Sequence, residues 1–328
     1  MTHHSVIIIG AGPIGLELAV ALKREGIDYL QLDAGQIGST MQWYPQQMLF
    51  HSSAERLAIS GVAIQTADQQ KPTREEFLAY LRAVVLQFDL RVRTYERVVD
   101  ARQDEHGGFT LTTNAVDGQH TYHCEALVLA IGAMHMPKLL GVPGEDLPHV
   151  SHYFHDPHTY FDKQLLIIGG RNSAVEAAVR CQRAGARVTL SYRKNDFDAA
   201  SVKFWLLPEI RSMIRDKRVR FLPGTTPREI RGGSVVLDPI GEVPADFVLM
   251  LTGYKQDTSL FAMLGVDLQS ADNKPRLDDA TMETNVRNVF VAGTAIAGSP
   301  AERVRIIVED CHVHVPRIVE TIASRLRQ

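Results

Sequence analysis

Apolar and polar positions along the first part of the chain follow the pattern of a strand, a helix and a second strand. Val6–Ile9 is a short apolar run typical of a buried strand, whereas Leu16–Arg24 carries apolar residues at helical spacing. Gly26 is suited to end that helix, and Tyr29–Leu32 has the composition of the next strand. Residues 5–34 therefore predict a β–α–β unit.

A second unit of the same kind begins 159 positions later. Leu165–Ile168 repeats the apolar run, and Gly169 falls at the place of Gly10. Gly185 likewise matches Gly26, so the repeat extends through the helix that follows the turn. The sequence thus predicts two β–α–β units of one architecture.

Weaker patterns predict the remaining elements. Residues 35–71 read as a long loop around short helices, and Thr73-Arg74-Glu75-Glu76 is a capping box that starts a helix. Short strands are expected at 91–95, 97–103, 108–113, 121–124, 127–132, 219–222, 234–237, 247–251 and 289–292, with a helix near 200–216.

A second capping box, Ser299-Pro300-Ala301-Glu302, lies near the end of the chain, with Pro300 at the favoured first helical position. It predicts a helix that runs from about Ser299 through the C-terminal region. Cys311 would then lie about three turns into that helix.

Composition narrows the class of protein. The 328 residues suffice for about two domains, and the formal charge of −3 gives no electrostatic reason to expect nucleic acid or an anionic membrane as a partner. No apolar run approaches the ~20 residues that span a bilayer, and no basic segment followed by an apolar one suggests a signal peptide. Cys124, Cys181 and Cys311 are far apart without a CxxC motif, which fits a reducing cytoplasm.

The first glycine-rich turn has the features of a dinucleotide site. Gly12 lets the backbone approach a pyrophosphate, and Gly15 lets helix and strand pack tightly. Asp33 follows Gly15 by 18 residues, near the position where an acid accepts hydrogen bonds from an adenosine ribose. A tight turn without a ligand is the alternative interpretation.

The second turn, Gly169-Gly170-Arg171-Asn172-Ser173-Ala174, predicts a different dinucleotide. Arg193 and Lys194 stand at the end of its second strand, where they would attract a 2′-phosphate that an acid would repel. We therefore expect NADPH rather than NADH. Arg171 replaces the middle glycine and would crowd a phosphate or contact it through its guanidinium. A Rossmann turn kept for folding, or a solvated basic patch, is the alternative.

Two dinucleotides, the first beside an acid, suggest FAD and NADPH. A flavin needs residues from elsewhere in the chain to enclose its ring. Gly293 and the predicted helix from Ser299 are suited to this task, because a helix N-terminus at the flavin N1–C2=O edge would stabilise the anionic reduced form.

The order of motifs resembles the thioredoxin reductase-type flavoproteins with two dinucleotide-binding domains. The motifs are the first glycine turn, then Leu127-Val128-Leu129-Ala130-Ile131-Gly132, then Gly169-Gly170-Arg171-Asn172-Ser173-Ala174-Val175-Glu176, and last Asn288-Val289-Phe290-Val291-Ala292-Gly293. Narrower motifs resemble the YpdA-like bacillithiol disulfide reductases within this group. These are Tyr44-Pro45 with Met48 and Phe50, Lys71-Pro72-Thr73-Arg74, Val142-Pro143-Gly144-Glu145, His152-Tyr153, Val202-Lys203-Phe204-Trp205 with Pro208-Glu209, and Glu283-Thr284-Asn285.

The resemblance implies an α/β fold of two Rossmann-like three-layer domains, the second inserted in the first. The FAD domain would comprise residues 1–148 and 247–328, and the NADPH domain residues 149–246. The implied FAD contacts are Gly10, Gly12, Pro13, Ile14, Gly15, Asp33, Ala34, Gln42, Met48, Ser52, Val98, Ala130, Gly132, Gly293 and Thr294. The implied NADPH contacts are Gly169, Gly170, Arg171, Asn172, Ser173, Ala174, Glu176, Arg193, Lys194 and Gly253.

The chain departs from the families that it resembles at two places that bear on the reaction. Thioredoxin reductases carry CxxC where this chain has His152-Tyr153-Phe154-His155, and neither a dithiol nor a metal site fits these residues. His152 is a possible substrate contact. The YpdA-like branch has cysteine in the first glycine turn, where this chain has Ile14. Free buried cysteines usually act as small hydrophobes. Thr294 stands where thioredoxin reductases have aspartate, and its hydroxyl can still hydrogen-bond.

The resemblance implies an FAD-dependent NADPH oxidoreductase that reduces a low-molecular-weight disulfide, such as bacillithiol disulfide. It also implies a homodimer or homotetramer in the cytoplasm, without membrane or metal. Because of Ile14, two alternatives stay open: an NADPH dehydrogenase that passes electrons to a quinone, a ferredoxin-like protein or oxygen, and a redox-sensing flavoprotein.

Overall fold

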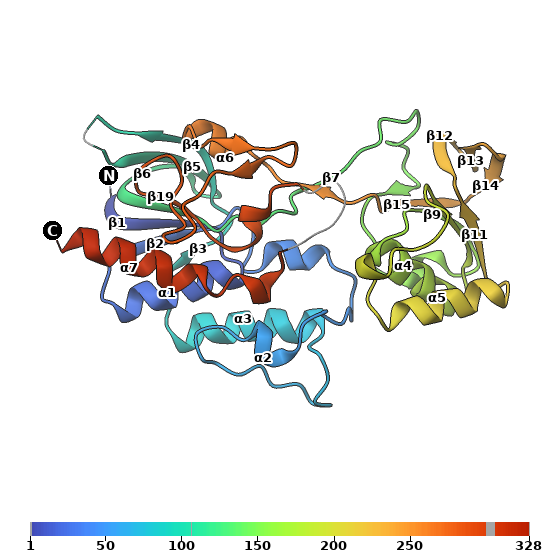
Figure 1. Cartoon of the computed structure of the whole chain (residues 1–328), viewed down its shortest axis with the longest axis horizontal. Helices are drawn as coiled ribbons and strands as arrows, with labels where there is room; N and C mark the ends of the chain where they lie inside the picture. Colours follow the sequence, from blue (N-terminus) through green and yellow to red (C-terminus); the bar gives the residue numbers. More distant parts are fainter. Residues whose placement is uncertain (1, 106, 300–305, 328) are drawn as a thin grey trace. The chain divides into compact units, whose positions relative to one another are not determined.

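The structure, a computed structural model, describes residues 2–105, 107–299 and 306–327 and divides them into two compact units (Figure 1). Unit 1 comprises Met1–Gln42, Gln47–Met136 and Tyr254–Gln328, and unit 2 comprises Trp43–Gln46 and Pro137–Gly253. The short antiparallel pair β7 (Met136–Pro137) and β16 (Tyr254–Lys255) lies where the chain passes between them.

Unit 1 is organised around one mixed sheet. Its order is β3 (Val92–Arg93), β2 (Tyr29–Leu32), β1 (Thr2–Ile9), β6 (Gly118–Leu129), β5 (Phe109–Ala115) and β4 (Arg97–Gln103), and β19 (Val289–Val291) also pairs with β6. The pairs of β1 with β2 and β6, of β2 with β3 and of β19 with β6 are parallel, whereas β4, β5 and β6 form an antiparallel meander.

Helices complete unit 1. α1 (Pro13–Arg24) contacts β1, β2, α3 (Arg74–Gln87) and α7 (His314–Leu326), and α6 (Ser259–Met263) contacts β4 (Figure 1). The short elements are α2 (Ala54–Leu57), β17 (Leu268–Gln269), β18 (Lys274–Pro275) and the 3-10 turns η1 (Ser39–Trp43), η4 (Gly293–Ala297) and η5 (Val308–Asp310). Ile7, Leu127 and Leu129 are fully buried in one cluster with Phe109 and Leu111 of β5, so the apolar runs of the sequence form the core.

Unit 2 has three layers. Its parallel sheet has the order β11 (Val219–Pro223), β10 (Arg187–Tyr192), β9 (Gln164–Ile168), β15 (Phe247–Met250) and β8 (Val150–Ser151). One face packs against α4 (Asn172–Arg183) and α5 (Leu206–Arg215), and the other against the antiparallel meander of β12 (Thr226–Arg231), β13 (Ser234–Asp238) and β14 (Gly241–Pro244). The 3-10 turns η2 (Pro157–Tyr160) and η3 (Ala199–Ser201) belong to this unit.

Strand periodicity explains the two cores of unit 2. Leu165 and Ile167 of β9 face the helices, whereas Leu166 and Ile168 face the meander. Successive side chains of a strand point to opposite faces, so an uninterrupted apolar run is what a sheet covered on both sides requires. The predicted α/β class with Rossmann-like units is confirmed.

The predicted long C-terminal helix is wrong in its described part. The Pro300–Glu302 portion of the capping box lies outside the described residues, and residues 306–313 contain only the turn η5 before α7 begins at His314. Pro316 explains the start, because proline is tolerated in the first turn of a helix and disrupts its interior. Ser299 uses its hydroxyl to accept a hydrogen bond from Gln256 N at 2.8 Å. Cys311 therefore precedes the helix.

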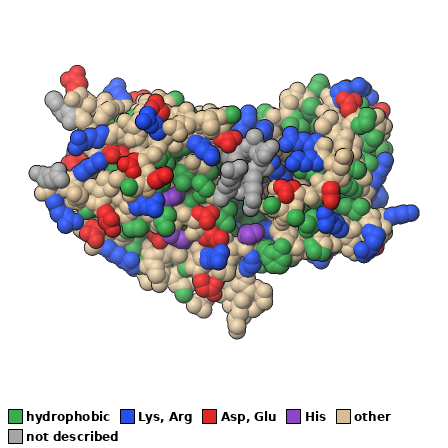
Figure 2. Space-filling model, viewed as in Figure 1, with side chains coloured by type: hydrophobic (Ala, Val, Ile, Leu, Met, Phe, Trp, Pro, Cys, Tyr) green, Lys and Arg blue, Asp and Glu red, His purple; other side chains and the backbone are tan. Residues whose placement is uncertain are grey.

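The surface charges reflect the nearly equal numbers of basic and acidic residues in the sequence. Basic and acidic side chains are interspersed over the left-hand part of the face drawn in Figure 2. Within residues 2–105, 107–299 and 306–327, no helix is both long and apolar enough to cross a membrane.

Candidate functional site

Three parallel strands of unit 1 end side by side and bring the predicted FAD segments together. Ile9 of β1 is in register with Leu129 of β6, which is in register with Val291 of β19. The residues that follow these strand ends are Gly10, Ala130 and Ala292. Ligands of open α/β sheets bind at such carboxyl edges. The shared register is the reason why motifs far apart in sequence form one site.

The three glycines of the first turn serve different purposes. A Cβ on Gly10 would clash with the carbonyl oxygen of Ala130, and the backbone there has φ +113°. A Cβ on Gly15 would clash with the carbonyl oxygen of Gly10. By contrast, no described atom lies within 4 Å of a Cβ placed on Gly12. The fold itself therefore requires Gly10 and Gly15, whereas Gly12 leaves open space in front of the first turn of α1.

Asp33 shapes the same turn. Its Oδ2 accepts a hydrogen bond from Ala11 N at 2.6 Å, and its Oδ1 accepts one from Gly35 N at 2.8 Å. Ser39 Oγ lies 3.3 Å from Oδ1 as a further donor. The carboxylate thus stabilises the loop around the turn. Its predicted contact with a ribose, and that of neighbouring Ala34 with FAD, stay predictions.

Ile14 lies at the junction of the glycine turn and the β19 turn. Its side chain is 5% exposed, and its Cβ would lie 3.5 Å from a Cβ on Gly293. Gly293 begins η4 with φ +73°, and its N–H donates a 3.2 Å hydrogen bond to His314 Nδ1. The glycine at 293 is therefore packed directly against Ile14.

Gln256 connects two predicted FAD segments. Its Nε2 donates to the carbonyl oxygens of Gly132 at 3.1 Å and Ala295 at 2.9 Å. The side chain is 5% exposed, and Oε1 has no hydrogen-bond partner among the described residues. Thr294 lies near Gly132, with Oγ1 3.8 Å from where a Cβ of Gly132 would be. A buried acceptor without a partner fits a site that a ligand completes.

The remaining predicted FAD residues lie on other parts of unit 1. Pro13 begins α1 at the favoured position, and Ser52 is buried before α2. Gln42 is exposed, and its carbonyl, like that of Met41, accepts from Arg74. Met48 O accepts from Arg74 N, and Val98 packs from β4 onto the core. Their contacts with FAD stay predictions.

The second glycine turn has the same backbone form with different packing. A Cβ on Gly169 would lie 2.5 Å from Leu251 O, and a Cβ on Gly170 would overlap the ring of Tyr192. Arg171, in the place of Gly12, is the extended residue before α4. Ala174 is fully buried where the first turn has Gly15. The fold therefore requires both glycines of this turn.

Glu176 and Asn172 are held by Lys203, a residue of the Val202-Lys203-Phe204-Trp205 motif whose partners the sequence did not indicate. Lys203 Nζ lies 2.9 Å from Glu176 Oε2, and both side chains are more than nine-tenths buried. Lys203 N donates to Asn172 Oδ1 at 3.2 Å. Glu176 thus carries a buried ion pair behind the turn, whereas Ser173 is exposed beside it. The predicted NADPH contacts of these residues stay predictions.

Arg193 and Lys194 follow β10 and are both exposed. Lys194 O accepts a hydrogen bond from Gly224 N at 3.2 Å, so the loop after β11 fixes the backbone of the basic pair. Gly253 has φ +105° at the end of unit 2. The basic pair therefore stands at the end of the second strand of the unit, as the sequence predicts.

His152 lies in a polar corner of unit 2. Its Nε2 is 3.7 Å from Glu145 Oε1, and its Nδ1 is buried without a partner in the described part of the chain. Glu145 also accepts hydrogen bonds from the backbone N–H groups of Leu140 and Gly141. In the described ranges, no group of three or more His, Cys, Asp or Glu side chains could hold a metal ion.

All three cysteines are unsuited to redox chemistry as they stand. Cys124, Cys181 and Cys311 are free, and each is at most 1% exposed. Burial raises the pKa of the Cys181 and Cys311 thiols to about 12, and it raises the pKa of the Cys124 thiol as well. The thiolate is the nucleophile in disulfide exchange, so none of these side chains is a competent attacking group.

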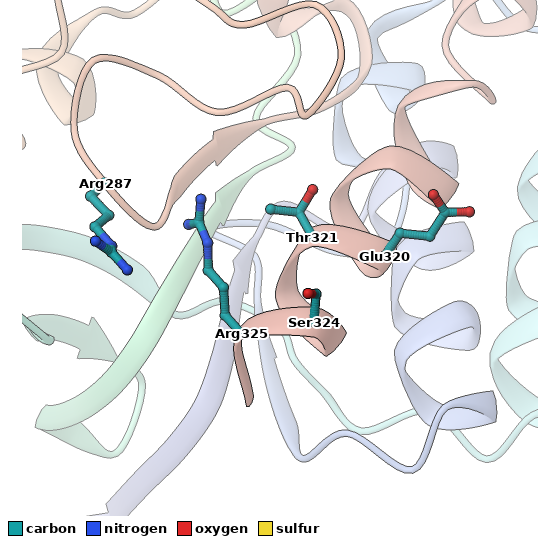
Figure 3. Close-up of a pocket in the computed structure, with 5 residues that line it drawn as sticks. All are labelled: Arg287, Glu320, Thr321, Ser324 and Arg325. Carbon is teal, nitrogen blue, oxygen red and sulfur yellow. The ribbon is translucent and has the colours of Figure 1, made fainter. Parts of the chain in front are cut away.

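A polar cavity of about 420 Å³ lies apart from these residues in unit 1, lined by Arg287, Glu320, Thr321, Ser324 and Arg325. Figure 3 shows Thr321, Ser324 and Arg325 projecting from the end of α7, with Arg287 on the loop before β19. Arg325 is engaged by Glu283 at 2.5 and 2.8 Å. The cavity contains none of the predicted cofactor residues.

Comparison with known proteins decides the family. Residues 7–293 match the family described as Pyridine nucleotide-disulphide oxidoreductase. The chain belongs to this family. It is 38% identical over 330 residues to the Bacilliredoxin reductase Bdr of Bacillus subtilis (strain 168), with 99% of each chain covered.

Solved structures of the same kind match this pyridine nucleotide-disulphide oxidoreductase over its whole length. The Bacillithiol Disulfide Reductase Bdr (YpdA) from Bacillus cereus has a TM-score of 0.93 at 37% identity, covering 99% of this chain and 100% of the other. The Bacillithiol Disulfide Reductase Bdr (YpdA) from Staphylococcus aureus has a TM-score of 0.92 at 32% identity, covering 99% of both. The chain is therefore an oxidoreductase of the family whose members use FAD and NADPH, and the resemblance to the YpdA-like branch is confirmed.

Proposed function

We propose that this enzyme uses NADPH to reduce a low-molecular-weight disulfide through FAD, without a thiol of its own. The observation that carries the proposal is the likeness, over 99% of both chains, to the Bdr of Bacillus subtilis. Bacillithiol disulfide, named for the Bacillus cereus and Staphylococcus aureus relatives, is the first substrate to test. The hydride of NADPH and one proton are consumed, the S–S bond breaks, and two thiols form.

The first turn would hold the FAD pyrophosphate. Gly12 leaves the necessary space, and the N–H groups at the start of α1 together with the helix dipole favour an anion there. Gln256 offers its buried Oε1 as an acceptor between Gly132 and Ala295. FAD supplies two-electron redox chemistry when it is bound. These residues would position it.

The second turn would hold NADPH. Arg193 and Lys194 present two cations at the end of β10, which favours a 2′-phosphate over a free 2′-hydroxyl. Arg171 occupies the place of the middle glycine, where its guanidinium can make a charge-assisted hydrogen bond with a phosphate.

The buried cysteines and Ile14 favour transfer that never links the substrate covalently to the chain. Alkylation of the NADPH-reduced protein tests this: after treatment with iodoacetamide, disulfide reduction should continue at the untreated rate. Thiol release per NADPH consumed is the measurement. Loss of activity in proportion to a modified cysteine would reject the proposal.

The buried cysteines and Ile14 also favour a second candidate function, that of an NADPH dehydrogenase whose acceptor is a quinone or a ferredoxin-like protein. Such acceptors need no enzyme thiol. Turnover with a quinone that is much faster than turnover with any disulfide would favour this candidate. Binding of NADPH without turnover on either class would instead favour a redox-sensing flavoprotein.

We further propose that the enzyme works in the cytoplasm as a homodimer or homotetramer. Three free buried cysteines are compatible with a reducing compartment. Light scattering of the FAD-loaded protein, at several concentrations, tests the oligomeric state. A mass equal to that of one chain at all concentrations would exclude an oligomer.

A further inference from the structure

Two histidines at the start of the last helix contact the two segments that frame the predicted FAD site. His312 reaches α1, the helix that begins at the first glycine turn, and His314 reaches Gly293 after β19. Figure 1 shows α7 running along α1, and the two helices are in contact. The two side chains therefore contact the helix and the turn that border the predicted FAD site.

Both ring nitrogens of His312 face oxygen atoms at hydrogen-bond distance. Nδ1 lies 2.7 Å from Glu17 Oε2, and Nε2 lies 2.9 Å from the carbonyl oxygen of Arg56. A carbonyl oxygen and a carboxylate can only accept, so a ring that satisfies both is the doubly protonated imidazolium. The ring joins α1 to α2 through the segment that precedes α7.

His314 has the opposite role. Its Nδ1 accepts the N–H of Gly293 at 3.2 Å, which requires an unprotonated Nδ1. The ring is 4% exposed, so neither it nor the Gly293 N–H has water as a substitute partner. Gly293 in turn packs against Ile14, in the first turn of α1. His312 and His314, two positions apart in the sequence, thus act as a hydrogen-bond donor and a hydrogen-bond acceptor.

We propose that His312 and His314 form a clasp that positions the first turn of α1 and the Gly293 turn against each other, and so sets how tightly FAD is held. His312 fixes α1 through Glu17, and His314 fixes Gly293. Both are positioning residues. The inference rests on FAD binding at this site in the proposed function.

The charged surroundings of His312 determine its dependence on pH. Glu17 faces it from α1, the Arg56–Glu309 ion pair (3.2 Å) lies beside it from α2 and η5, and its neighbour at the start of α7 is His314, which also lies near the cation Arg317. Tyr80 of α3 lies close enough to Glu17 for the carboxylate to affect its pKa. The hydrogen bond with Glu17 raises the pKa of His312 above its ordinary value of 6.5, against the effect of burial. The contribution of the pair is therefore complete below pH 6.5 and lost as pH rises through that raised pKa.

The first experiment measures FAD affinity in wild type, Glu17→Gln, His312→Gln and the double variant, by flavin fluorescence on reconstitution of apoprotein between pH 6 and pH 9. The wild type should lose affinity with rising pH. Each single variant should bind FAD about tenfold more weakly at pH 6 and show no such pH dependence, and the double variant should be no weaker than either one. His4→Gln on β1, which breaks the exposed 2.9 Å pair with Asp28, is the matched control and should behave as wild type.

The second experiment tests the accepting ring. His314→Asn keeps an acceptor oxygen near the place of Nδ1 and should retain FAD, whereas His314→Leu leaves Gly293 N–H without a partner and should bind FAD about tenfold more weakly. Variants of Glu17 and His312 with wild-type affinity and pH dependence would overturn the clasp, as would equal affinity of His314→Asn and His314→Leu. If His314→Leu fails to fold, the Glu17–His312 cycle still decides. Absence of FAD binding in wild type would instead overturn the proposed function.

Discussion

Lys203 Nζ lies 2.9 Å from Glu176 Oε2, and the two side chains form a buried ion pair behind the second glycine turn. The pair connects α4, whose N-terminus follows Arg171, to the segment that precedes α5. Removing one charge from such a pair leaves the other desolvated and uncompensated. The stability of unit 2 therefore depends on both partners.

Lys203→Met should destabilise unit 2 by about 3 kcal/mol, because Glu176 then stays buried with only the more distant cation Arg180, at 3.7 Å, beside it. The Lys203→Met/Glu176→Gln double variant should recover part of that loss. Urea unfolding followed by the fluorescence of Trp43 and Trp205, both in unit 2, measures both losses. Arg211→Gln, which breaks the exposed 2.9 Å pair with Asp196, serves as the control and should cost about 0–1 kcal/mol. Equal losses for Lys203→Met and Arg211→Gln would contradict the assignment.

Two alanine substitutions separate the requirements of the fold from those of FAD. Gly15→Ala places a Cβ onto the carbonyl oxygen of Gly10 and should lower the melting temperature even of the apoprotein. Gly12→Ala meets no described atom within 4 Å, so the apoprotein should melt like wild type while its FAD affinity falls. Calorimetry of the apoprotein and of its titration with FAD provides the melting temperature and the FAD affinity. A normal FAD affinity in Gly12→Ala would show that the pyrophosphate does not approach this residue.

Arg193→Ala should lower kcat/KM for NADPH by about tenfold and leave kcat/KM for NADH nearly unchanged, because only NADPH carries the 2′-phosphate. Lys194→Ala should act in the same direction. Arg220→Ala, on the neighbouring strand β11, is the control. If the ratio of the two efficiencies stays that of wild type in Arg193→Ala, the basic pair does not read the phosphate.

Acid should weaken the contact between the C-terminal helix and the β19 loop. The hydrogen bond from Arg325 lowers the pKa of Glu283, so the carboxylate contributes stability above pH 4.5 that is lost as pH falls through its lowered pKa. Glu283→Gln should be less stable than wild type at pH 7, with a difference that shrinks toward pH 3. Thermal unfolding across that range measures it. A difference that does not change with pH would contradict the role of the charge.

The sequence predicted the local features of this fold well. The strand expected at 97–103 is β4 over the same residues, and the Thr73 capping box is present with both of its hydrogen bonds. Both features depend on residues a few positions apart. The strands expected at 121–124 and 127–132 proved to be one strand, β6, because β1 pairs with it on both sides of Glu125, from Tyr122 to Leu129. Pairing with strands that are distant in the chain cannot be predicted from the sequence of one segment.

The parts of the site that escaped prediction depend on distant contacts. His312 meets Glu17 across 295 positions, and Lys203 meets Glu176 across 27. No spacing rule connects such pairs. The start of α7 was foreseeable, because Pro316 is incompatible with the interior of a helix that starts near Ser299. The glycine turns themselves were predictable from their motif, although the atoms that require glycine at Gly10 and Gly169, the carbonyl oxygens of Ala130 and Leu251, are distant in sequence.

Anaerobic rapid mixing of the FAD-loaded protein with NADPH and then bacillithiol disulfide tests the central claim most directly. The flavin absorbance should bleach with NADPH and return with the disulfide, two thiols should appear per NADPH, and the mass of the chain should stay unmodified throughout. A mixed disulfide on Cys124, Cys181 or Cys311 during turnover, or a flavin that only a quinone or oxygen reoxidises, would contradict reduction of a disulfide without an enzyme thiol.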